Sequence, residues 1–418
     1  MKVFKFGGAS VKDAQGVKNV GLILNKYPKE KIVVVVSAMG KITNALESLV
    51  RSKDAKETGK ILGEIKKYHL DIANELFTDK KNPIFGILDD EFNKLKQIVS
   101  SSNSSFYEKY DQVVSLGEVL STYLVSYALN ALGTNNQWVD ARNIVSTDDN
   151  YREGKVDFDK TKSNAQKTII PALDAKGIVI TQGFIGKASN GKTVTLGREG
   201  SDYTAAILAY CLDAESVTIW KDVPGVLNAD PKWFDDTVKI DHLSYQDAIE
   251  LSYYGATVIH PKTIKPLQNK GIPLFVKSFV KPDETGTMVD NNFSHLPVPC
   301  FIFKINQVLI SISPKDFSFI VEENLSGIFN ELAKQRVKVN VMENSALNFS
   351  ICMDDDAEKI PALTAALKEN FRVLYNKNLE LITIRYYDQA TIDRVCTNKK
   401  VLMEHKSRYT VQLVVQEK

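Results

Sequence analysis

The first part of the chain alternates short apolar runs with amphipathic stretches. Residues 3–6 form a run that ends at Gly7-Gly8, and residues 32–36 are an unbroken β-branched run that ends at Ser37. Apolar positions at three- and four-residue spacing follow each run and predict helices. An unbroken β-branched run is typical of a strand buried on both faces of a parallel sheet. The repeated order of strand, small-residue turn and helix predicts an α/β domain with a mainly parallel sheet.

Later segments extend this pattern. Further buried strands are expected at 138–139, 178–180, 217–219 and 274–276, with helices between them. Residues 51–110 are instead rich in lysine and glutamate with scattered apolar positions. We expect them to form solvated helices that act as a lid or cap over the sheet.

The pattern changes after residues 283–299, a polar stretch with glycine and prolines that is expected to be a linker. Beyond it the order is strand, helix, strand, strand, helix and strand, which is the ferredoxin-like split arrangement. A second unit of this kind has a short helix and looks truncated. We therefore expect one large domain at 1–290, a first small unit at 298–376 and a truncated second unit at 377–418.

Composition narrows the class of protein. The 418 residues carry 53 basic and 51 acidic side chains, so the chain has no broad cationic field and nucleic acid is not an expected partner. The four cysteines lie far apart and form no CxxC pair, which favours reduced thiols over disulfides or a zinc site. No stretch approaches the length of a membrane span, and the N-terminus does not look like a signal peptide. We expect a cytoplasmic protein without membrane contact.

Glycine-rich turns carry the candidate chemistry. Lys5 precedes Gly7 and Gly8, and backbone amides of glycines, a helix N-terminus and a lysine together suit an anion. Taken alone, Lys5 also fits an edge-strand lysine whose ammonium reaches water. The turn SAMGKITN at 37–44 has small and hydroxyl side chains that suit a carboxylate or phosphate, although many ordinary turns share this composition.

The turn TLGREGSDYTAA at 195–206 is the least ordinary of the set. Its glycines flank Arg198, whose guanidinium can fork onto a carboxylate. Asp202, in the first turn of the next helix, either serves the site or only satisfies the helix dipole. Glu118, in SLGE at 115–118, is either another first-turn dipole residue or a carboxylate that receives a substrate ammonium.

Together these segments resemble the aspartate kinases of the amino-acid kinase superfamily. The matching motifs, which cover nearly all of residues 1–290 in order, are KFGGAS, SAMGKITN, SLGE, TQGFIG, TLGREGSDYTAA, WKDVPGV, NADP and GATVIHPKT. The C-terminal units resemble ACT domains, which sense amino acids. The resemblance implies a three-layer αβα sandwich with a mainly parallel sheet, followed by ferredoxin-like ACT units. It also implies transfer of phosphate from Mg-ATP to the side-chain carboxylate of L-aspartate, the first step towards lysine, threonine and methionine.

The resemblance assigns roles to individual residues. Lys5 would contact the transferring phosphate, and Asp202 would orient the groups around it. Glu118 would bind the aspartate ammonium and Arg198 a carboxylate. The other assignments are phosphate-binding amides at Gly7 and Gly8, aspartate-positioning hydroxyls at Ser37, Thr43 and Ser201, and nucleotide contacts at Lys221, Asp222 and Lys232. The substrate carboxylate is already anionic, so no general base is required, and the nucleotide phosphates are expected to hold most of the Mg²⁺ coordination.

The sequence departs from the family pattern at several positions. Ala9 stands where threonine is usual, Glu199 replaces the middle glycine of GRGGSD, and Thr257 replaces a lysine that often contacts the nucleotide. A carboxylate at position 199 would repel an anionic substrate unless it points outward. Asn340 falls near where the first ACT unit often binds an effector such as lysine or threonine, but 319–327 lacks the usual glycine-rich start. We expect weak or altered feedback inhibition, and a homodimer paired through the ACT-like units.

Two other interpretations remain open on the sequence. A kinase for glutamate or N-acetylglutamate is disfavoured by the SLGE and WKDVPG segments and by the ACT-like tail. A non-catalytic amino-acid sensor or regulatory subunit would account for Ala9, Glu199 and Thr257. The presence of Lys5 and Arg198 in their turns speaks against it, because polar residues at loops usually mark function.

Overall fold

The computed structural model describes residues 1–418 except 102–103, 257–258, 293–297 and 317. The expectation at Thr257 therefore falls outside the described residues. The chain divides into two compact units, each built from three segments. The first unit comprises Met1–Val226, Lys239–Ile249 and Val258–Ser294, and the second comprises Leu227–Val238, Glu250–Thr257 and His295–Lys418.

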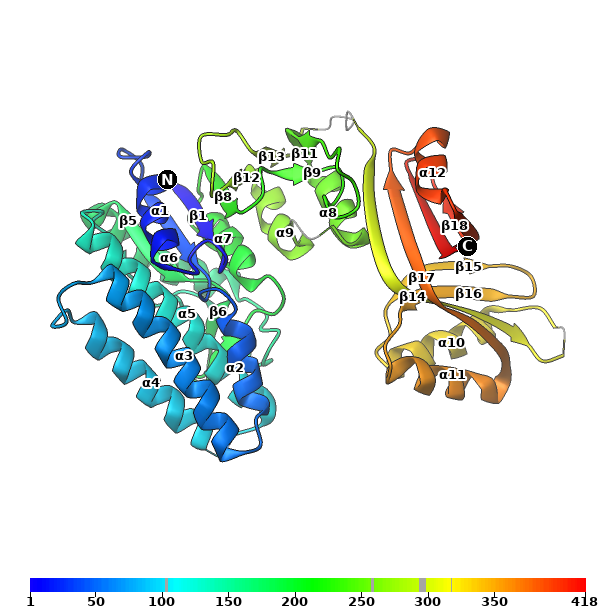
Figure 1. Cartoon of the computed structure of the whole chain (residues 1–418), viewed down its shortest axis with the longest axis horizontal. Coiled ribbons are helices and arrows are strands. Elements are labelled where there is room, and N and C mark those ends of the chain that lie inside the picture. Colours follow the sequence, from blue (N-terminus) through cyan, green and yellow to red (C-terminus); the bar gives the residue numbers. More distant parts are fainter. Residues whose placement is uncertain (102–103, 257–258, 293–297, 317) are drawn as a thin grey trace. The chain divides into compact units, whose positions relative to one another are not determined.

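An eight-stranded sheet forms the centre of the first unit, in the order β11-β13-β12-β8-β1-β2-β5-β3 (Figure 1). Neighbouring strands are parallel except β12 and β13. The strands are β1 Lys2–Phe6, β2 Ile32–Val36, β3 Gln137–Trp138, β5 Ile178–Gln182, β8 Ser216–Lys221, β11 His242–Ser244, β12 Leu274–Ser278 and β13 Thr287–Asp290. This mainly parallel sheet confirms the expected α/β class.

Helices cover both faces of this sheet. On one face α5 packs on β2, β3 and β5 and contacts α1, and on the other α6 and α7 pack on strands and on each other. The helices of this unit are α1 Ala14–Leu24, α2 Ile42–Arg51, α3 Ala55–Leu76, α4 Ile84–Ser100, α5 Phe106–Ala131, the 3₁₀ turn η1 Ala141–Asn143, α6 Phe158–Lys176, α7 Gly200–Cys211 and α9 Pro261–Lys270. The arrangement is the three-layer sandwich that the sequence predicted.

Shorter elements follow in the chain, and two of them, β9 and α8, each cross a boundary between segments of the two units. A small sheet has the order β4-β6-β7, and β9 pairs with β10. Their bounds are β4 Ser146–Thr147, β6 Ile185–Ala188, β7 Thr193–Thr195, β9 Val226–Leu227 and β10 Lys239–Ile240, and helix α8 spans Tyr245–Tyr254.

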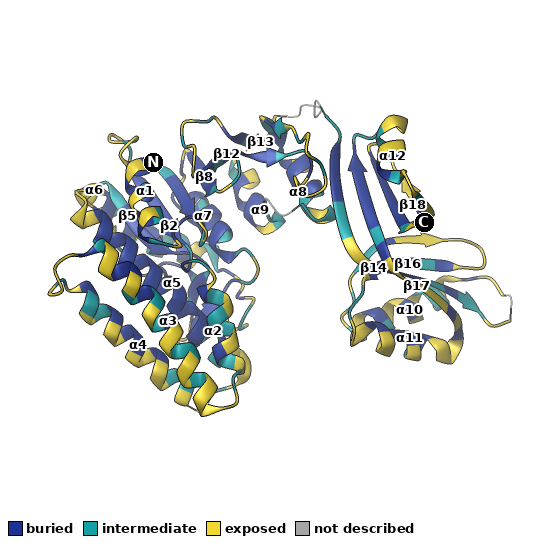
Figure 2. Cartoon of the chain, in the orientation of Figure 1, coloured by how far each residue is buried: buried dark blue, intermediate teal, exposed yellow. Residues whose placement is uncertain are grey.

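The lysine- and glutamate-rich region forms the expected helices, but they are not simply solvated. One face of α3 and α4 is buried against α2 and α5, and Ile65, Ile72 and Leu88 belong to the same hydrophobic core as residues of α5, β1 and β2. Figure 2 shows buried and exposed positions alternating around these helices. The expectation of solvated helices over the sheet is therefore wrong for this inner face, because one apolar side chain per turn is enough to bury a helix face.

Buried His69 lies inside this helical layer on α3. Its Nδ1 is 2.8 Å from the Ile65 carbonyl oxygen, and its Nε2 has no hydrogen-bond partner among the described residues. Burial lowers the pKa of His69 to about 4 from its usual value of 6.5. The imidazole is therefore neutral in the folded protein at pH values where the unfolded chain already binds a proton.

We expect this difference to make the protein acid-sensitive. Because the folded pKa lies below the unfolded one, the contribution of His69 to the free energy of unfolding is complete above pH 6.5 and is lost as the pH falls through about 4. Between pH 7 and pH 4.5, the free energy of unfolding of the wild type should thus fall by about 2 to 3 kcal/mol more than that of His69→Phe. Urea unfolding at both pH values measures this, and an unchanged difference would refute it.

Part of the expected linker is a strand. Within residues 283–299, β13 pairs antiparallel with β12 and parallel with β11, and its Thr287 and Val289 are fully buried. The alternation of buried and exposed positions spans only four residues, so the surrounding polar sequence hid it. The linker prediction is wrong for this segment, and residues 293–297 lie outside the described residues.

The second unit is built on a six-stranded antiparallel sheet in the order β15-β16-β14-β17-β19-β18. The elements are β14 Cys300–Pro314, α10 Glu322–Lys334, β15 Val339–Asn344, β16 Phe349–Asp354, α11 Lys359–Asn370, β17 Phe371–Arg385, α12 Gln389–Cys396, β18 Lys399–Lys406 and β19 Thr410–Glu417. An antiparallel sheet with helices agrees with the expected ACT-like units.

The two ACT-like units share strands. Val308 and Ile310 of β14 pack in a core with α10 and α11, whereas Phe301 of the same strand packs with Ile382 and α12. A bulge between Lys304 and Gln307 separates the two halves of the strand. One continuous strand thus serves both cores, and the ranges 298–376 and 377–418 stay a prediction.

Candidate active site

The central strand β1 carries Lys5 into the site. β1 lies between β2 and β8, and Lys5 is 8% exposed, so its interpretation as an edge-strand lysine is wrong. Phe4 and Phe6 point to the face covered by α1 and α5. Because side chains alternate along a strand, Lys5 points to the opposite face, where it meets the first turn of α7.

An ion-pair cluster forms where β1, β8 and α7 meet. The Nζ of Lys5 lies 2.5 Å from Oδ1 of Asp202, and the Nζ of Lys221, at the end of β8, lies 3.6 Å from Oδ2. Burial by itself would raise the pKa of Asp202, but the charges of the two lysines outweigh it and lower the pKa. Asp202 is therefore ionised at neutral pH and does more than satisfy the helix dipole.

Two turns after the parallel strands pack closely beside this cluster. A Cβ atom on Gly8 would lie 2.5 Å from the carbonyl oxygen of Ala38, so no larger residue fits there. The Gly40 amide donates to the Gly8 carbonyl at 2.9 Å. A Cβ atom on Gly7 would lie 3.4 Å from the Lys5 Nζ, which places the backbone of Gly7 next to the ammonium. The structure thus brings Gly7, Gly8 and Lys5 together, as expected.

Glu118 reaches the same region from α5. It lies in the middle of this helix, so its interpretation as a first-turn dipole residue is wrong. Its carboxyl group is 3% exposed, accepts a hydrogen bond from the Ala38 backbone and interacts electrostatically with Lys5. Burial raises the pKa of Glu118 to about 8, against the lowering effects of those two partners. Its Oε2 has no hydrogen-bond partner among the described residues, which leaves it available to a ligand cation.

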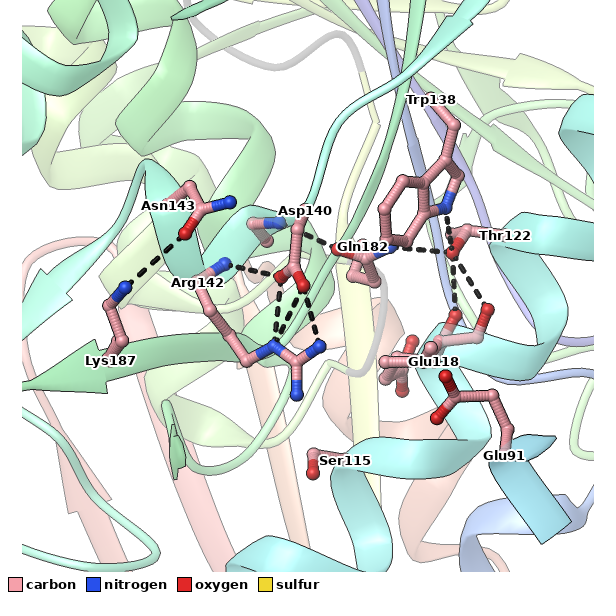
Figure 3. A network of polar contacts seen from close by, with 12 residues as sticks. Glu91, Ser115, Glu118, Thr122, Trp138, Asp140, Arg142, Asn143, Gln182 and Lys187 are labelled. Carbon is pink, nitrogen blue, oxygen red and sulfur yellow. Dashed lines mark hydrogen bonds and ion pairs between the residues drawn. The ribbon is translucent and has the colours of Figure 1, made fainter. Parts of the chain in front are cut away.

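A buried polar network, which the sequence did not reveal, supports the helix turn of Glu118 (Figure 3). The Thr122 hydroxyl donates to the Glu118 carbonyl at 3.0 Å and lies 2.7 Å from the Gln182 Nε2 and 3.0 Å from the Trp138 Nε1. Gln182 in turn accepts from the Ala141 amide at 2.7 Å. The network ties α5 to β3 and β5. Gln182 lies within the TQGFIG motif, which was its only signal in the sequence.

The turn that contains Arg198, called the arginine turn below, folds tightly before α7. Gly197 has φ of 77°, a left-handed conformation that glycine adopts at little cost. A Cβ atom on Gly183 would lie 2.6 Å from the Ser201 Cα, which fixes the first turn of α7 against the end of β5. Arg198 is exposed, and Ser201 is buried at 8% exposure. The turn therefore leaves the Arg198 guanidinium accessible to an anion.

Lys262 is a further cation beside this turn that sequence reasoning missed. A Cβ atom on Gly197 would lie 3.7 Å from the Lys262 Nζ, which brings the first turn of α9 next to the arginine turn. Lys262 is part of the GATVIHPKT motif, but a lysine after a proline carries no signal of its own.

Glu199 does not point outward. Its Oε2 is buried, and the carboxyl group interacts with Lys221, Asp202 and Lys5. Burial raises the pKa of Glu199, and the charges of the lysines and of Arg198 only partly offset this effect. The departure from the family pattern therefore lies within the cluster.

The remaining expected residues lie on other elements of the chain. Thr43 is half-buried in the first turn of α2. Ser37 lies in the turn before this helix, and its carbonyl oxygen accepts a hydrogen bond from the Ser121 hydroxyl at 2.7 Å. Asp222 follows Lys221 and is exposed. Lys232 and Asn340 belong to the second unit, so their roles remain predictions.

Across the described part of the chain, no helix combines the length and apolarity needed to cross a membrane. Within the same residues, no group of three or more His, Cys, Asp or Glu side chains is arranged to hold a metal ion.

Comparison with known proteins agrees with this geometry. The chain matches the family model described as amino acid kinase family over residues 1–278. Lysine-sensitive aspartokinase 3 of Escherichia coli (strain K12) is 31% identical over 362 residues, which are 84% of this chain and 78% of that protein. The chloroplastic bifunctional aspartokinase/homoserine dehydrogenase 1 of Arabidopsis thaliana is 29% identical over 88% of this chain, which spans only 42% of that longer protein. The crystal structure of E. coli aspartokinase III with aspartate and ADP superposes with a TM-score of 0.83 at 28% identity, covering 99% of this chain and 96% of that chain.

Proposed function

Because this chain belongs to the amino acid kinase family, and within it to the aspartokinases, we propose that the Lys5–Asp202–Lys221 cluster is its phosphoryl-transfer site. The reaction is the ATP-dependent phosphorylation of the side-chain carboxylate of L-aspartate. The observation that carries this proposal is the position of two lysines around one buried carboxylate, beside the glycine turns of two central parallel strands. In open α/β sheets, ligands bind at such carboxyl ends.

The chemistry requires two anions to meet. A carboxylate oxygen of aspartate forms a bond to the γ-phosphorus of ATP while the bond to the ADP oxygen breaks, and no proton needs to be removed. Lys5 lowers the repulsion and stabilises charge on the transferring group, while Gly7 and Gly8 offer backbone donors to it. Asp202 holds the ammonium groups of Lys5 and Lys221 in position. A bound Mg²⁺ would neutralise phosphate charge, and the phosphate oxygens would supply most of its ligands.

The same site has groups of the right charge for an amino acid. Glu118 would accept the ammonium of aspartate, and its unpartnered Oε2 supports this role. Arg198 would bind a carboxylate, since its guanidinium is exposed and forks well onto planar oxygens. The hydroxyl groups at Ser37, Thr43 and Ser201 would position the rest of the substrate. Asp222, Lys221 and Lys232 are proposed to lie along the nucleotide.

A steady-state assay tests the function directly. With Mg-ATP, we expect aspartate to drive ADP release, with kcat/KM well above the values for glutamate and N-acetylglutamate. A preference for either of the other substrates would contradict the proposal. Absence of both nucleotide affinity and turnover, together with calorimetric binding of an amino-acid effector, would instead indicate a sensor.

Regulation by the ACT-like units is proposed to be weak or altered. The Nδ2 of Asn340 lies 2.8 Å from the Gln307 Oε1 and 2.9 Å from the Asp354 Oδ1, and its Oδ1 accepts from the Lys304 Nζ at 3.0 Å. The polar groups of Asn340 are thus already engaged within the protein. An effector would have to compete with these contacts.

We therefore expect lysine, threonine or methionine at about 1 mM to slow turnover by less than about twofold. The measurement is the initial rate at subsaturating aspartate with each amino acid added in turn. A reaction with added glycine, which should not be inhibited, serves as the control. Strong inhibition at submillimolar lysine or threonine would contradict this expectation.

We also propose a homodimer formed through the second unit. The edge strands of its sheet are β15 and β18, and an exposed edge pairs readily with another chain. Apolar side chains exposed on this unit include Phe319, Val321, Met342, Leu347 and Leu374. Light scattering at micromolar concentration would show a mass of twice 46.7 kDa. The proposed location remains the cytoplasm, because the four cysteines are free thiols.

A further inference from the structure

The carboxylates of the cluster are not equally engaged. Each oxygen of Asp202 lies beside a lysine, at 2.5 Å for Lys5 and 3.6 Å for Lys221. Glu199 has a buried Oε2 without a hydrogen-bond partner among the described residues. An unpartnered buried carboxylate oxygen is costly unless a cation or a proton meets it. Unlike Asp202, whose oxygens both lie beside lysines, Glu199 therefore has an oxygen with coordination capacity to spare.

The backbone at Glu199 also calls for an explanation. Its φ is 53°, in the left-handed region that non-glycine residues adopt at a cost. It occupies the N-cap position of α7, but its side chain makes no capping hydrogen bond. Neither the conformational preference of glutamate nor a capping contact therefore explains the left-handed backbone at Glu199. Strained residues of this kind occur at ligand sites.

The surroundings indicate what kind of ligand would complete the carboxylate. Its charged neighbours include Lys221, Lys5, Arg198 and the like-charged Asp202. The buried Oε2 of Glu199 has no hydrogen-bond partner among the described residues, so a cation close to it would satisfy this oxygen. The nucleotide phosphates proposed to bind at Lys5 are accompanied by a divalent cation of this kind.

On the basis of the proposed function, we propose that Glu199 is a protein ligand to the divalent cation that enters with the nucleotide. Magnesium prefers oxygen ligands and is usually held by one or two carboxylates together with phosphate oxygens and water. The carboxylate of Glu199 fits this pattern as a single protein ligand. The described residues contain no group of three or more His, Cys, Asp or Glu side chains that would hold the ion without the phosphates. A cation bound by Glu199 would also offset the repulsion expected between this carboxylate and an anionic substrate.

Binding of Mn²⁺ in the presence of ADP tests this proposal without turnover. Mn²⁺ substitutes for Mg²⁺, and its free concentration is read from its electron paramagnetic resonance signal. We expect Glu199→Gln to weaken Mn²⁺ binding to the enzyme–ADP complex by about tenfold or more. In EDTA, the same variant should bind metal-free ADP more tightly than the wild type, because one negative charge beside the phosphates is gone.

The control is Glu153→Gln. The Glu153 Cγ would lie 3.6 Å from a Cβ atom on Gly197, so this carboxylate lies beside the same turn, but it does not appear among the charged neighbours of Glu199. We expect it to leave both affinities unchanged. If Glu199→Gln does not fold, Glu199→Gly carries the same test, since glycine suits the left-handed backbone at this position.

Equal Mn²⁺ affinity in the wild type and the Glu199 variant would overturn the proposal. Weaker binding of metal-free ADP would also overturn it, because Glu199 would then contact the nucleotide itself. Failure of the proposed function is a separate result, seen as absence of aspartate-dependent ADP release by the wild type. The Mn²⁺ comparison uses ADP without aspartate, so it decides the role of Glu199 in either case.

Discussion

Lys5→Met is expected to lower kcat by about 10³-fold or more while changing the KM for aspartate by only a few fold. The ammonium of Lys5 lies at the meeting point of the glycine turns and Asp202, where negative charge has to be stabilised as the phosphoryl group moves. Its contribution is therefore larger in the transition state than in the bound substrate. Steady-state kinetics at saturating ATP measures both parameters.

Two further variants separate catalysis from folding. Removing Lys5 leaves Asp202 buried with Lys221 still nearby as an ion-pair partner, and breaking a buried pair costs about 3 to 5 kcal/mol. Adding Asp202→Asn should recover much of this stability without recovering activity. Lys2→Met, on the same strand but paired with Glu30, should leave kcat unchanged. A Lys5 variant that keeps wild-type kcat would refute the proposed role.

Glu118→Gln is expected to raise the KM for aspartate by about 100-fold with a smaller effect on ATP. A glutamine of the same size keeps the packing but cannot neutralise the substrate ammonium. Glu91→Gln is a suitable control, because Glu91 is also buried and carboxylic (Figure 3) but pairs with Lys94. An unchanged KM in Glu118→Gln would show that the ammonium binds elsewhere.

The pH dependence of aspartate binding provides a second signature of Glu118. Because the pKa of Glu118 is about 8 in the absence of ligand, the group is mostly protonated at pH 7 and has to lose its proton to pair with an ammonium. Below pH 8, aspartate affinity should therefore increase about tenfold for each unit by which the pH is raised. Above pH 8 it should level off. This slope should disappear in Glu118→Gln. Calorimetry in buffers of different ionisation enthalpy would detect the released proton.

The raised pKa of Glu118 also affects stability. Since the pKa of Glu118 in the folded protein lies above its usual value of 4.5, the contribution of Glu118 to the free energy of unfolding is complete below pH 4.5 and is lost as the pH rises through about 8. Glu118→Gln should consequently be no less stable than the wild type at pH 8.5. This measurement distinguishes a lost ligand contact from a damaged fold.

Much of the fold was predictable from local patterns. The β-branched run at 32–36 and the turns after β1 and β2 lie where the sequence placed them, because a strand buried on both faces has to be apolar throughout. Two regions were not predicted correctly. The short strand β13 lies in a polar stretch, and the inner faces of α3 and α4 are buried although most of their residues are charged or polar. In both cases few apolar residues carry the burial, so the local pattern is weak.

By itself, the sequence determined the class of the fold and the turns that carry the chemistry, because periodicity and turn composition are local properties. The tertiary structure alone decided how the charges pair. Lys5, Asp202 and Lys221 are far apart in the chain and meet only because β1 and β8 are neighbours and α7 begins at their carboxyl ends. The same contacts bury Glu118 and turn Glu199 inward. Burial and the positions of neighbouring charges set the protonation and coordination of these groups, and neither can be read from the order of residues.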